Sequence, residues 1–294
     1  MVRKYGRLIV VLLLLMLSAG LFGLSFRDER ASRQLYGGLQ DQVSATRTPT
    51  QPAAEPTPVQ ARAAVTPTRP ATVRLSPGPT LLPTAVPTLS PEEEETGRIQ
   101  VVLRALAADN PDIAGWIRIP GTNIDYPVVR GDDNRFYLDH DIRQASARNG
   151  SIFMDYRNEP ELGQRHTILY GHHTRDHTMF TDLMGYKQQA FFKENARIEY
   201  YTLDSKTTWV IFAAYVTGVD FYYIQTIFAD DAAYARLIEQ IRSRSAFFRP
   251  VAVTPDDPIL TLSTCTYEFK NARFAVHAVL EDAGKTPDAP GEHE

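Results

Sequence analysis

Short strand-like segments separated by turn residues dominate the chain from residue 116 to residue 280. Each segment combines β-branched or aromatic residues with a rough polar/apolar alternation, and Gly, Pro or Asn residues separate it from the next. The eight segments are 116–119, 124–129, 151–154, 167–170, 197–202, 208–216, 258–264 and 273–280. This pattern predicts a mainly β fold, an antiparallel barrel or a sandwich, because short strands need a second layer or closure to bury their apolar face.

Helices are expected at three places around these strands. Ser90 and Glu93 match a capping box, and apolar residues then recur at helical spacing, so we expect a helix from residue 90 to about 108. A short helix is expected near 178–184, and a longer amphipathic one near 231–244. The helices should pack on the outside of the strand region.

Residues 1–27 contain a short basic end and an apolar segment. The run 8–26 carries no charge and would span roughly 28 Å as a helix at about 1.5 Å per residue, close to the thickness of a bilayer core. We therefore expect an uncleaved transmembrane anchor. A cleaved signal peptide is the alternative, but its apolar region is usually only about 7–15 residues long and no small-x-small site follows here.

A composition change marks the next part of the chain. Between about residues 46 and 91 the sequence alternates Pro, Thr, Ala and Val, which predicts an extended, polyproline-rich linker over 28–89. Such a linker would lift the following domain off a membrane, or would simply be a spacer of no particular length. The folded domain is then expected over 90–283, with a disordered tail at 284–294.

The chain has a single cysteine, Cys265, at the end of one strand-like segment, and Arg273 begins the next. A polar connection containing Asn271 joins them, so an antiparallel return would bring the thiol and the guanidinium side by side. The guanidinium would favour the thiolate and donate hydrogen bonds to an oxyanion. The alternative is a buried structural cysteine. One cysteine excludes an internal disulfide framework and a multi-cysteine zinc site.

A histidine partner for the thiol is available in His172, which follows the 167–170 segment and Gly171. A nucleophilic cysteine needs a base of this kind within hydrogen-bond reach. His173 and His177 would share one face if their loop were helical, which is a possible arrangement of two metal ligands. No HExxH pattern or obvious third ligand accompanies them. We therefore expect neither a metal nor any other cofactor.

These motifs together resemble the sortases, the cysteine transpeptidases of bacterial surfaces. The sequence TLSTC at 261–265 is followed by an arginine and a small apolar strand, and YGH occurs about ninety residues earlier. Further stretches resemble the class B branch: NPDIAGWIRIPGTNIDYPVV at 110–129, DNRFYLDHD at 133–141 and GSIFMDYRN at 150–158. The resemblance covers roughly residues 98–281. It implies the eight-stranded sortase-type β-barrel with flanking helices.

The resemblance also implies roles for individual residues. Cys265 would be the nucleophile, His172 the general acid and base, and Arg273 the donor to the oxyanion or the substrate carbonyl. The residues implied in binding the substrate peptide are Asn134, Leu138, Tyr223, Ile224 and Ser263. One position departs from the family pattern: class B members often carry an acidic residue directly after the cysteine, and this chain has Thr266.

The function implied by the resemblance is that of a membrane-anchored transpeptidase with its catalytic domain outside the membrane. It would cleave a C-terminal sorting motif of surface proteins and transfer the acyl group to an amine, such as a peptidoglycan precursor or a pilin-type lysine. Two alternatives remain open: a cysteine hydrolase without transfer, and an inactive, envelope-tethered binding protein. A net charge of −4 and a pI near 6.0 give no case for nucleic-acid binding.

Overall fold

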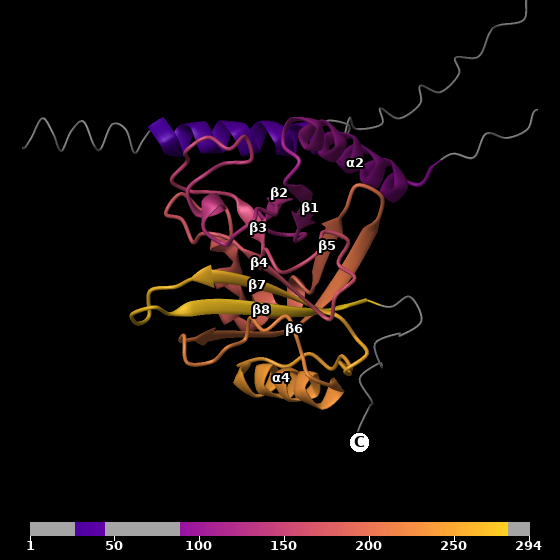
Figure 1. Ribbon diagram of the computed structural model, residues 1–294, viewed down its shortest axis with the longest axis vertical. Coiled ribbons are helices and arrows are strands. Elements are labelled where there is room, and N and C mark those ends of the chain that lie inside the picture. The colour runs from indigo at the N-terminus through magenta and orange to yellow at the C-terminus, as the bar shows by residue number, and fades with distance from the viewer. Residues whose placement is uncertain (1–26, 45–88, 282–294) are drawn as a thin grey trace, which may run out of the picture.

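The computed structural model describes residues 27–44 and 89–281, and its central element is a closed β-barrel (Figure 1). The strands are β1 (Ile113–Arg118), β2 (Asp125–Val129), β3 (Ile152–Met154), β4 (His166–Tyr170), β5 (Arg197–Tyr201), β6 (Lys206–Thr217), β7 (Ile259–Cys265) and β8 (Arg273–Leu280). Around the barrel they follow the order β1-β2-β3-β4-β7-β8-β6-β5. The predicted mainly β, eight-stranded barrel is therefore confirmed, and the sandwich is excluded.

The strand directions differ from the expected antiparallel pattern at two places. β2 pairs with β3 in parallel, and β4 pairs with β7 in parallel, whereas the other neighbours are antiparallel. Parallel neighbours need a long crossover rather than a tight turn, and residues 130–151 supply one between β2 and β3. The β4–β7 pair matters most for the site, because it sets the ends of these two strands next to each other.

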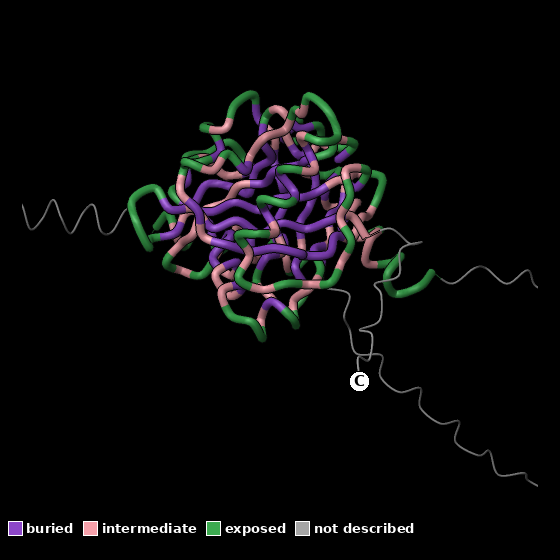
Figure 2. The backbone as a smooth tube through the Cα atoms, turned by 90° about the horizontal axis from the view of Figure 1, so that it is seen from below, coloured by how far each residue is buried: buried purple, intermediate pink, exposed green. Residues whose placement is uncertain are grey.

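Apolar side chains fill the barrel and also cover part of its outside. The larger cluster includes Trp116, Ile117, Leu169 and Leu262, and all four are buried. A second cluster lies between the outer face of the sheet and α4 (Asp231–Arg244), whose apolar face packs there as expected. Figure 2 shows the buried strands running through the centre, with most exposed residues at the periphery.

The flanking helices match the sequence in two of three places. α2 (Pro91–Asp109) begins at the predicted capping box, since Ser90 accepts from the Glu93 N–H and the Glu93 carboxylate accepts from the Ser90 N–H. The short helix expected near 178–184 is displaced. The chain instead forms a 3₁₀ segment, η2 (Thr181–Lys187), followed by α3 (Gln189–Glu194), and a further 3₁₀ turn, η1 (Phe136–Leu138), precedes β3.

The expected linker over 28–89 is wrong at its beginning, because residues 27–44 form a helix. Figure 1 shows this indigo helix beside α2, at the opposite end of the molecule from α4. Tyr36, Leu39 and Val43 are buried at i, i+3 and i+7 spacing, which is the apolar stripe of a helix that packs on a core. The Pro/Thr-rich composition begins only near residue 46, so the predicted linker boundary at residue 28 lies too early in the chain.

Polar contacts attach this helix to the barrel as well. The Tyr36 hydroxyl donates to the Gly150 carbonyl over 3.2 Å, and the Gln40 amide donates to the Asp125 carbonyl over 2.8 Å. Arg98 of α2 donates to the Val43 carbonyl over 3.4 Å. The helix at 27–44 is therefore held against the domain by hydrogen bonds as well as by its apolar stripe.

Some predictions concern the two ends of the chain and the middle of the linker. The expected anchor at 8–26, the rest of the linker and the expected tail at 284–294 lie outside the described residues. Within 27–44 and 89–281, none of the helices is both long and apolar enough to cross a membrane.

Candidate active site

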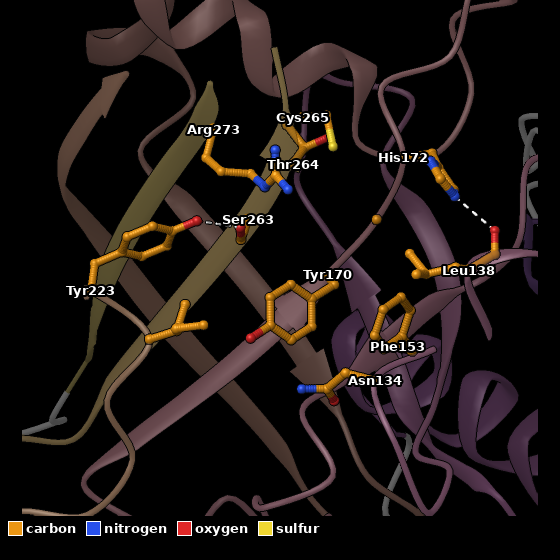
Figure 3. Close-up of a pocket in the computed structure, with 12 residues that line it drawn as sticks. Asn134, Leu138, Phe153, Tyr170, His172, Tyr223, Ser263, Thr264, Cys265 and Arg273 are labelled. Carbon is orange, nitrogen blue, oxygen red and sulfur yellow. Dashed lines mark hydrogen bonds between the residues drawn. The ribbon is translucent and has the colours of Figure 1, made fainter. Parts of the chain in front are cut away.

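A pocket of about 310 Å³ opens where β4 and β7 end and β8 begins (Figure 3). It contains every residue that the sequence analysis selected as catalytic or peptide-binding, although those residues lie on different elements. The lining residues are Asn134, Leu138, Phe153, Tyr170, Gly171, His172, Tyr223, Ile224, Ser263, Thr264, Cys265 and Arg273. Residues as far apart in sequence as 134 and 273 thus share one cavity, as expected of a binding site.

Cys265 and Arg273 are direct partners in the antiparallel β7–β8 ladder. The predicted position of Arg273 beside Cys265 is therefore confirmed. Asn271 has a positive φ of 62° in the connection, and the Thr266 N–H donates to the Ala272 carbonyl, so the loop closes directly behind the pair. In Figure 3 the Arg273 side chain extends toward the end of β7, and the Cys265 thiol projects toward the side where His172 lies.

His172 reaches the pocket because β4 runs parallel to β7. Tyr170 is paired with Ser263, and the Gly171 N–H donates to the Ser263 carbonyl over 3.2 Å, which continues the ladder to the residue before His172. A Cβ atom at position 171 would lie 2.5 Å from Ile152 and 2.7 Å from Phe180. Gly171 is thus required for close packing at the strand end rather than for flexibility.

The imidazole of His172 is oriented by a main-chain carbonyl. Its Nε2 lies 2.7 Å from the carbonyl oxygen of Leu138, in the loop between β2 and β3. Since a carbonyl oxygen only accepts hydrogen bonds, Nε2 must carry a proton. In the neutral ring Nδ1 is then the basic atom, and a proton gained by the imidazole resides there. The contact fixes which nitrogen can exchange protons with a substrate.

The far wall of the pocket comes from the segment between β6 and α4. Tyr223 and Ile224 lie on it, and the Tyr223 hydroxyl hydrogen-bonds to the Ser263 hydroxyl over 2.7 Å. Tyr223 is buried, and this burial raises its pKa. Leu138, by contrast, keeps 42% of its surface exposed. The implied peptide-binding residues therefore form a wall and a rim around the thiol.

Thr266, where class B members often have an acid, is connected to an acid nearby in sequence. Its hydroxyl donates to Glu268, and Lys187 of η2 pairs with the same carboxylate. Burial raises the pKa of Glu268, but hydrogen bonds from Lys187 and Thr266 outweigh it and lower the pKa to about 2. The loop that follows Cys265 thus contains a carboxylate, which Lys187 and Thr266 hold in place.

Sequence reasoning missed four of the lining residues. Phe153, Tyr170, Gly171 and Thr264 had been quoted within motifs or strands, but none was assigned to the site. Their positions at or near the ends of β3, β4 and β7 could have identified them, because the ends of these strands meet at one edge of the barrel.

The loop that carries His173 and His177 is not helical, so the arrangement considered for two metal ligands does not form. Among residues 27–44 and 89–281, His, Cys, Asp and Glu side chains form no group of three that could hold a metal ion.

Comparison with known proteins decides the family. The sortase domain profile matches residues 117–281, which is more than half of the chain and includes the whole pocket. The chain belongs to the sortase family. Sortase B of Listeria monocytogenes is 37% identical over 186 residues, covering 63% of this chain and 76% of the relative. Sortase B of Staphylococcus aureus is 42% identical over 173 residues, covering 58% of this chain and 71% of the relative.

Solved structures agree with this assignment. A Staphylococcus aureus sortase B–substrate complex matches with a TM-score of 0.59 and 37% identity, over 63% of this chain and 87% of that chain. The sortase is therefore of class B and is a cysteine transpeptidase by family. Its barrel, with the loops that carry the site, is the part it shares with these relatives.

Proposed function

We propose that this sortase cleaves a C-terminal sorting motif of surface proteins through a thioester on Cys265 and transfers the acyl group to an amine. The observation that carries the proposal is the single pocket that collects Cys265, His172 and Arg273 from three different elements. A nucleophile, a proton carrier and a cationic donor are the groups that acyl transfer requires. The pocket walls supply the peptide-binding surface.

In the acylation half-reaction the Cys265 thiolate attacks the carbonyl carbon of the motif's threonine. The oxygen becomes an oxyanion, and Arg273, opposite Cys265 in the ladder, donates hydrogen bonds to it. The leaving amine takes the proton from Nδ1 of His172, while Nε2 stays bound to the Leu138 carbonyl. The products are the thioester and the released C-terminal fragment.

In the transfer half-reaction an amine attacks the thioester carbonyl. His172, neutral after acylation, accepts the proton of the incoming amine at Nδ1, and Cys265 leaves as thiolate. The acceptor is an amine of the cell wall, such as a peptidoglycan precursor, or a pilin-type lysine of another surface protein. Water is the slow competitor at this step.

Product analysis separates transfer from hydrolysis. The full chain would be incubated with a library of sorting-motif peptides, with and without a panel of amines, and the products identified by mass spectrometry. A new amide that forms with one amine supports transpeptidation and names both substrates. A free acid in every case, whatever the amine, favours the hydrolase. No cleavage of any peptide would contradict the proposed function.

We further propose that residues 8–26 anchor the protein in the cell membrane with the barrel outside. The support is the length and apolarity of that run together with the surface location of sorting-motif proteins. Fractionation of cells that produce the full chain tests it: the protein should stay with membranes at high salt, and protease added to spheroplasts should remove the barrel. Release by salt, or protection from protease, would contradict the proposal.

A further inference from the structure

Asn134 and Tyr170 form the floor of the pocket. Behind this floor lies a buried carboxylate, Asp155, that the chemistry above does not use. Its side chain is fully buried, just after β3. Arg157 binds it with two parallel hydrogen bonds, Nε to Oδ1 and a terminal nitrogen to Oδ2, both at 2.7 Å. Such a bidentate pair is strong and fixes the plane of both groups. Neither residue lines the pocket.

The same carboxylate holds two residues that do line the pocket. The Tyr170 hydroxyl donates to Oδ2 of Asp155 over 2.9 Å, and the Asn134 amide donates to that oxygen over 3.0 Å. The other amide atom of Asn134, its oxygen, accepts from the Tyr156 N–H. Asn134 and Tyr170 therefore have fixed orientations, and Asp155 determines them.

Arg157 also reaches the opposite wall of the pocket. One terminal nitrogen donates to the Ile224 carbonyl over 3.0 Å, and the other donates to the Tyr222 hydroxyl over 2.8 Å. Residues 218–230 contain neither helix nor strand, so no backbone ladder holds this segment. Side-chain hydrogen bonds to its carbonyls help to hold it in place. His166 of β4 contributes a second such contact, to the Gln225 carbonyl over 2.7 Å.

We propose that Arg157 and Asp155 are positioning residues that clamp the floor and the far wall of the peptide pocket in one geometry. The proposal rests on the peptide-cleaving function given above. Only an arginine can serve both sides at once, because its planar fork carries five donors while a lysine has three on a single atom. The clamp touches no reacting atom, so it acts on peptide binding rather than on bond making.

This division of roles predicts a specific kinetic signature. A wall that is free to move must be ordered each time a peptide binds, and that cost reduces binding of the ground state and the transition state alike. Loss of such uniform binding raises KM and leaves kcat nearly unchanged. A general loss of folding would instead lower the amount of active enzyme and thus kcat.

The test uses the full chain with Arg157→Gln, and Arg157→Lys and Tyr222→Phe as milder variants. Arg242→Gln is the matched control, because Arg242 also donates to a loop carbonyl, that of Val251 over 2.6 Å, but on α4 and outside the pocket. For a peptide that the wild type cleaves, Arg157→Gln should raise KM about tenfold or more with little change in kcat. Tyr222→Phe should have a smaller effect of the same kind, and the control should leave KM unchanged.

A second readout is independent of peptide cleavage. Hydrogen exchange of the amides at 222–225 should be faster in Arg157→Gln than in the wild type and in Arg242→Gln. Unchanged exchange there, or an unchanged KM in the Arg157 variants, would overturn the proposal, as would equal effects of Arg157→Gln and the control. Should the wild type cleave no peptide, the proposed function fails while the exchange comparison still decides whether the clamp holds the wall.

Discussion

Cys265 and Arg273 face each other across the β7–β8 ladder, as directly opposed residues of an antiparallel pair. The Cα atoms of such pairs are about 4.5–5.5 Å apart, so the two side chains start from adjacent positions on neighbouring strands. The alignment follows from strand register and needs no adjustment of loops. This position is what the proposed role of Arg273 as donor to the oxyanion requires.

Replacement of Arg273 should therefore slow acylation strongly. Arg273→Met should lower kcat/KM by about 10²–10³-fold, the usual cost of losing one oxyanion donor. Lys270→Met, which removes a positive charge from an exposed position of the same loop, is the control and should retain most of the activity. Single-turnover cleavage of a sorting peptide measures both. Similar losses in the two variants would mean that Arg273 acts only through its general charge.

His172 should matter most when the leaving group needs a proton. His172→Ala should reduce cleavage of a peptide amide by about 10²–10⁴-fold. The loss should be much smaller for a peptide ester with an acidic phenol as leaving group, because a phenolate can leave without taking up a proton. Rates of product release measure the ratio. Equal losses on amide and ester would contradict the role of His172 as general acid.

The helix at 27–44 should contribute to the stability of the barrel. Tyr36→Ala should lower the free energy of unfolding by about 3–5 kcal/mol, because a buried aromatic ring packed edge-on against Tyr126 is lost. Tyr36→Phe removes only the hydroxyl contacts and should cost about 1 kcal/mol. Gln34→Ala, at an exposed position, should be neutral within about 0.5 kcal/mol. Denaturant titration distinguishes them, and three neutral variants would show that this helix does not dock.

Two buried histidines form a hydrogen-bond chain whose direction is fixed at one end. His166 donates from Nδ1 to the Gln225 carbonyl, so its Nε2 accepts from the Thr261 hydroxyl. Thr261 in turn accepts from Nδ1 of His277, whose Nε2 accepts from the Tyr215 hydroxyl. Full burial favours the neutral form of both imidazoles, and with both neutral every donor and acceptor in this chain is matched.

Acidification should therefore destabilise the fold. Burial lowers the pKa of His166 to about 4 and lowers that of His277 as well, so the folded protein binds fewer protons than the unfolded chain below about pH 6.5. The contribution of His166 is fully present above pH 6.5 and falls by roughly 3 kcal/mol as the pH drops to about 4. Urea titrations across this range measure it. His166→Gln should have a shallower pH dependence, and an identical slope would contradict the neutral state of His166.

The sequence contained the local signals for most of the barrel. Alternating strands, the Ser90 cap and the amphipathic stretch at 231–244 are all encoded within a few residues, and each was found at its predicted place. The Cys265–Arg273 pairing was predictable for the same reason, because a short polar connection between two strands forces an antiparallel return. His172 could be selected by residue type, but its hydrogen bond to the Leu138 carbonyl depends on a loop that is remote in sequence.

Features that depend on distant contacts could not be derived in this way. The apolar spacing of Tyr36, Leu39 and Val43 was visible, yet only the docked structure shows that this stripe has a core to cover. The Asp155–Arg157 pair sits in a stretch whose only sequence signal was family likeness, since its partners Tyr170 and Ile224 come from other elements. The parallel pairs β2–β3 and β4–β7 likewise arise from closure of the whole barrel.

The most direct test of the central claim is mass spectrometry of the full chain, quenched shortly after mixing with a cleaved sorting peptide and no added amine. We expect a mass increase equal to the acyl fragment, located on Cys265 by fragmentation, sensitive to hydroxylamine and absent from Cys265→Ala. An adduct on another residue, or peptide cleavage that persists in Cys265→Ala, would show that this pocket does not work through a Cys265 thioester.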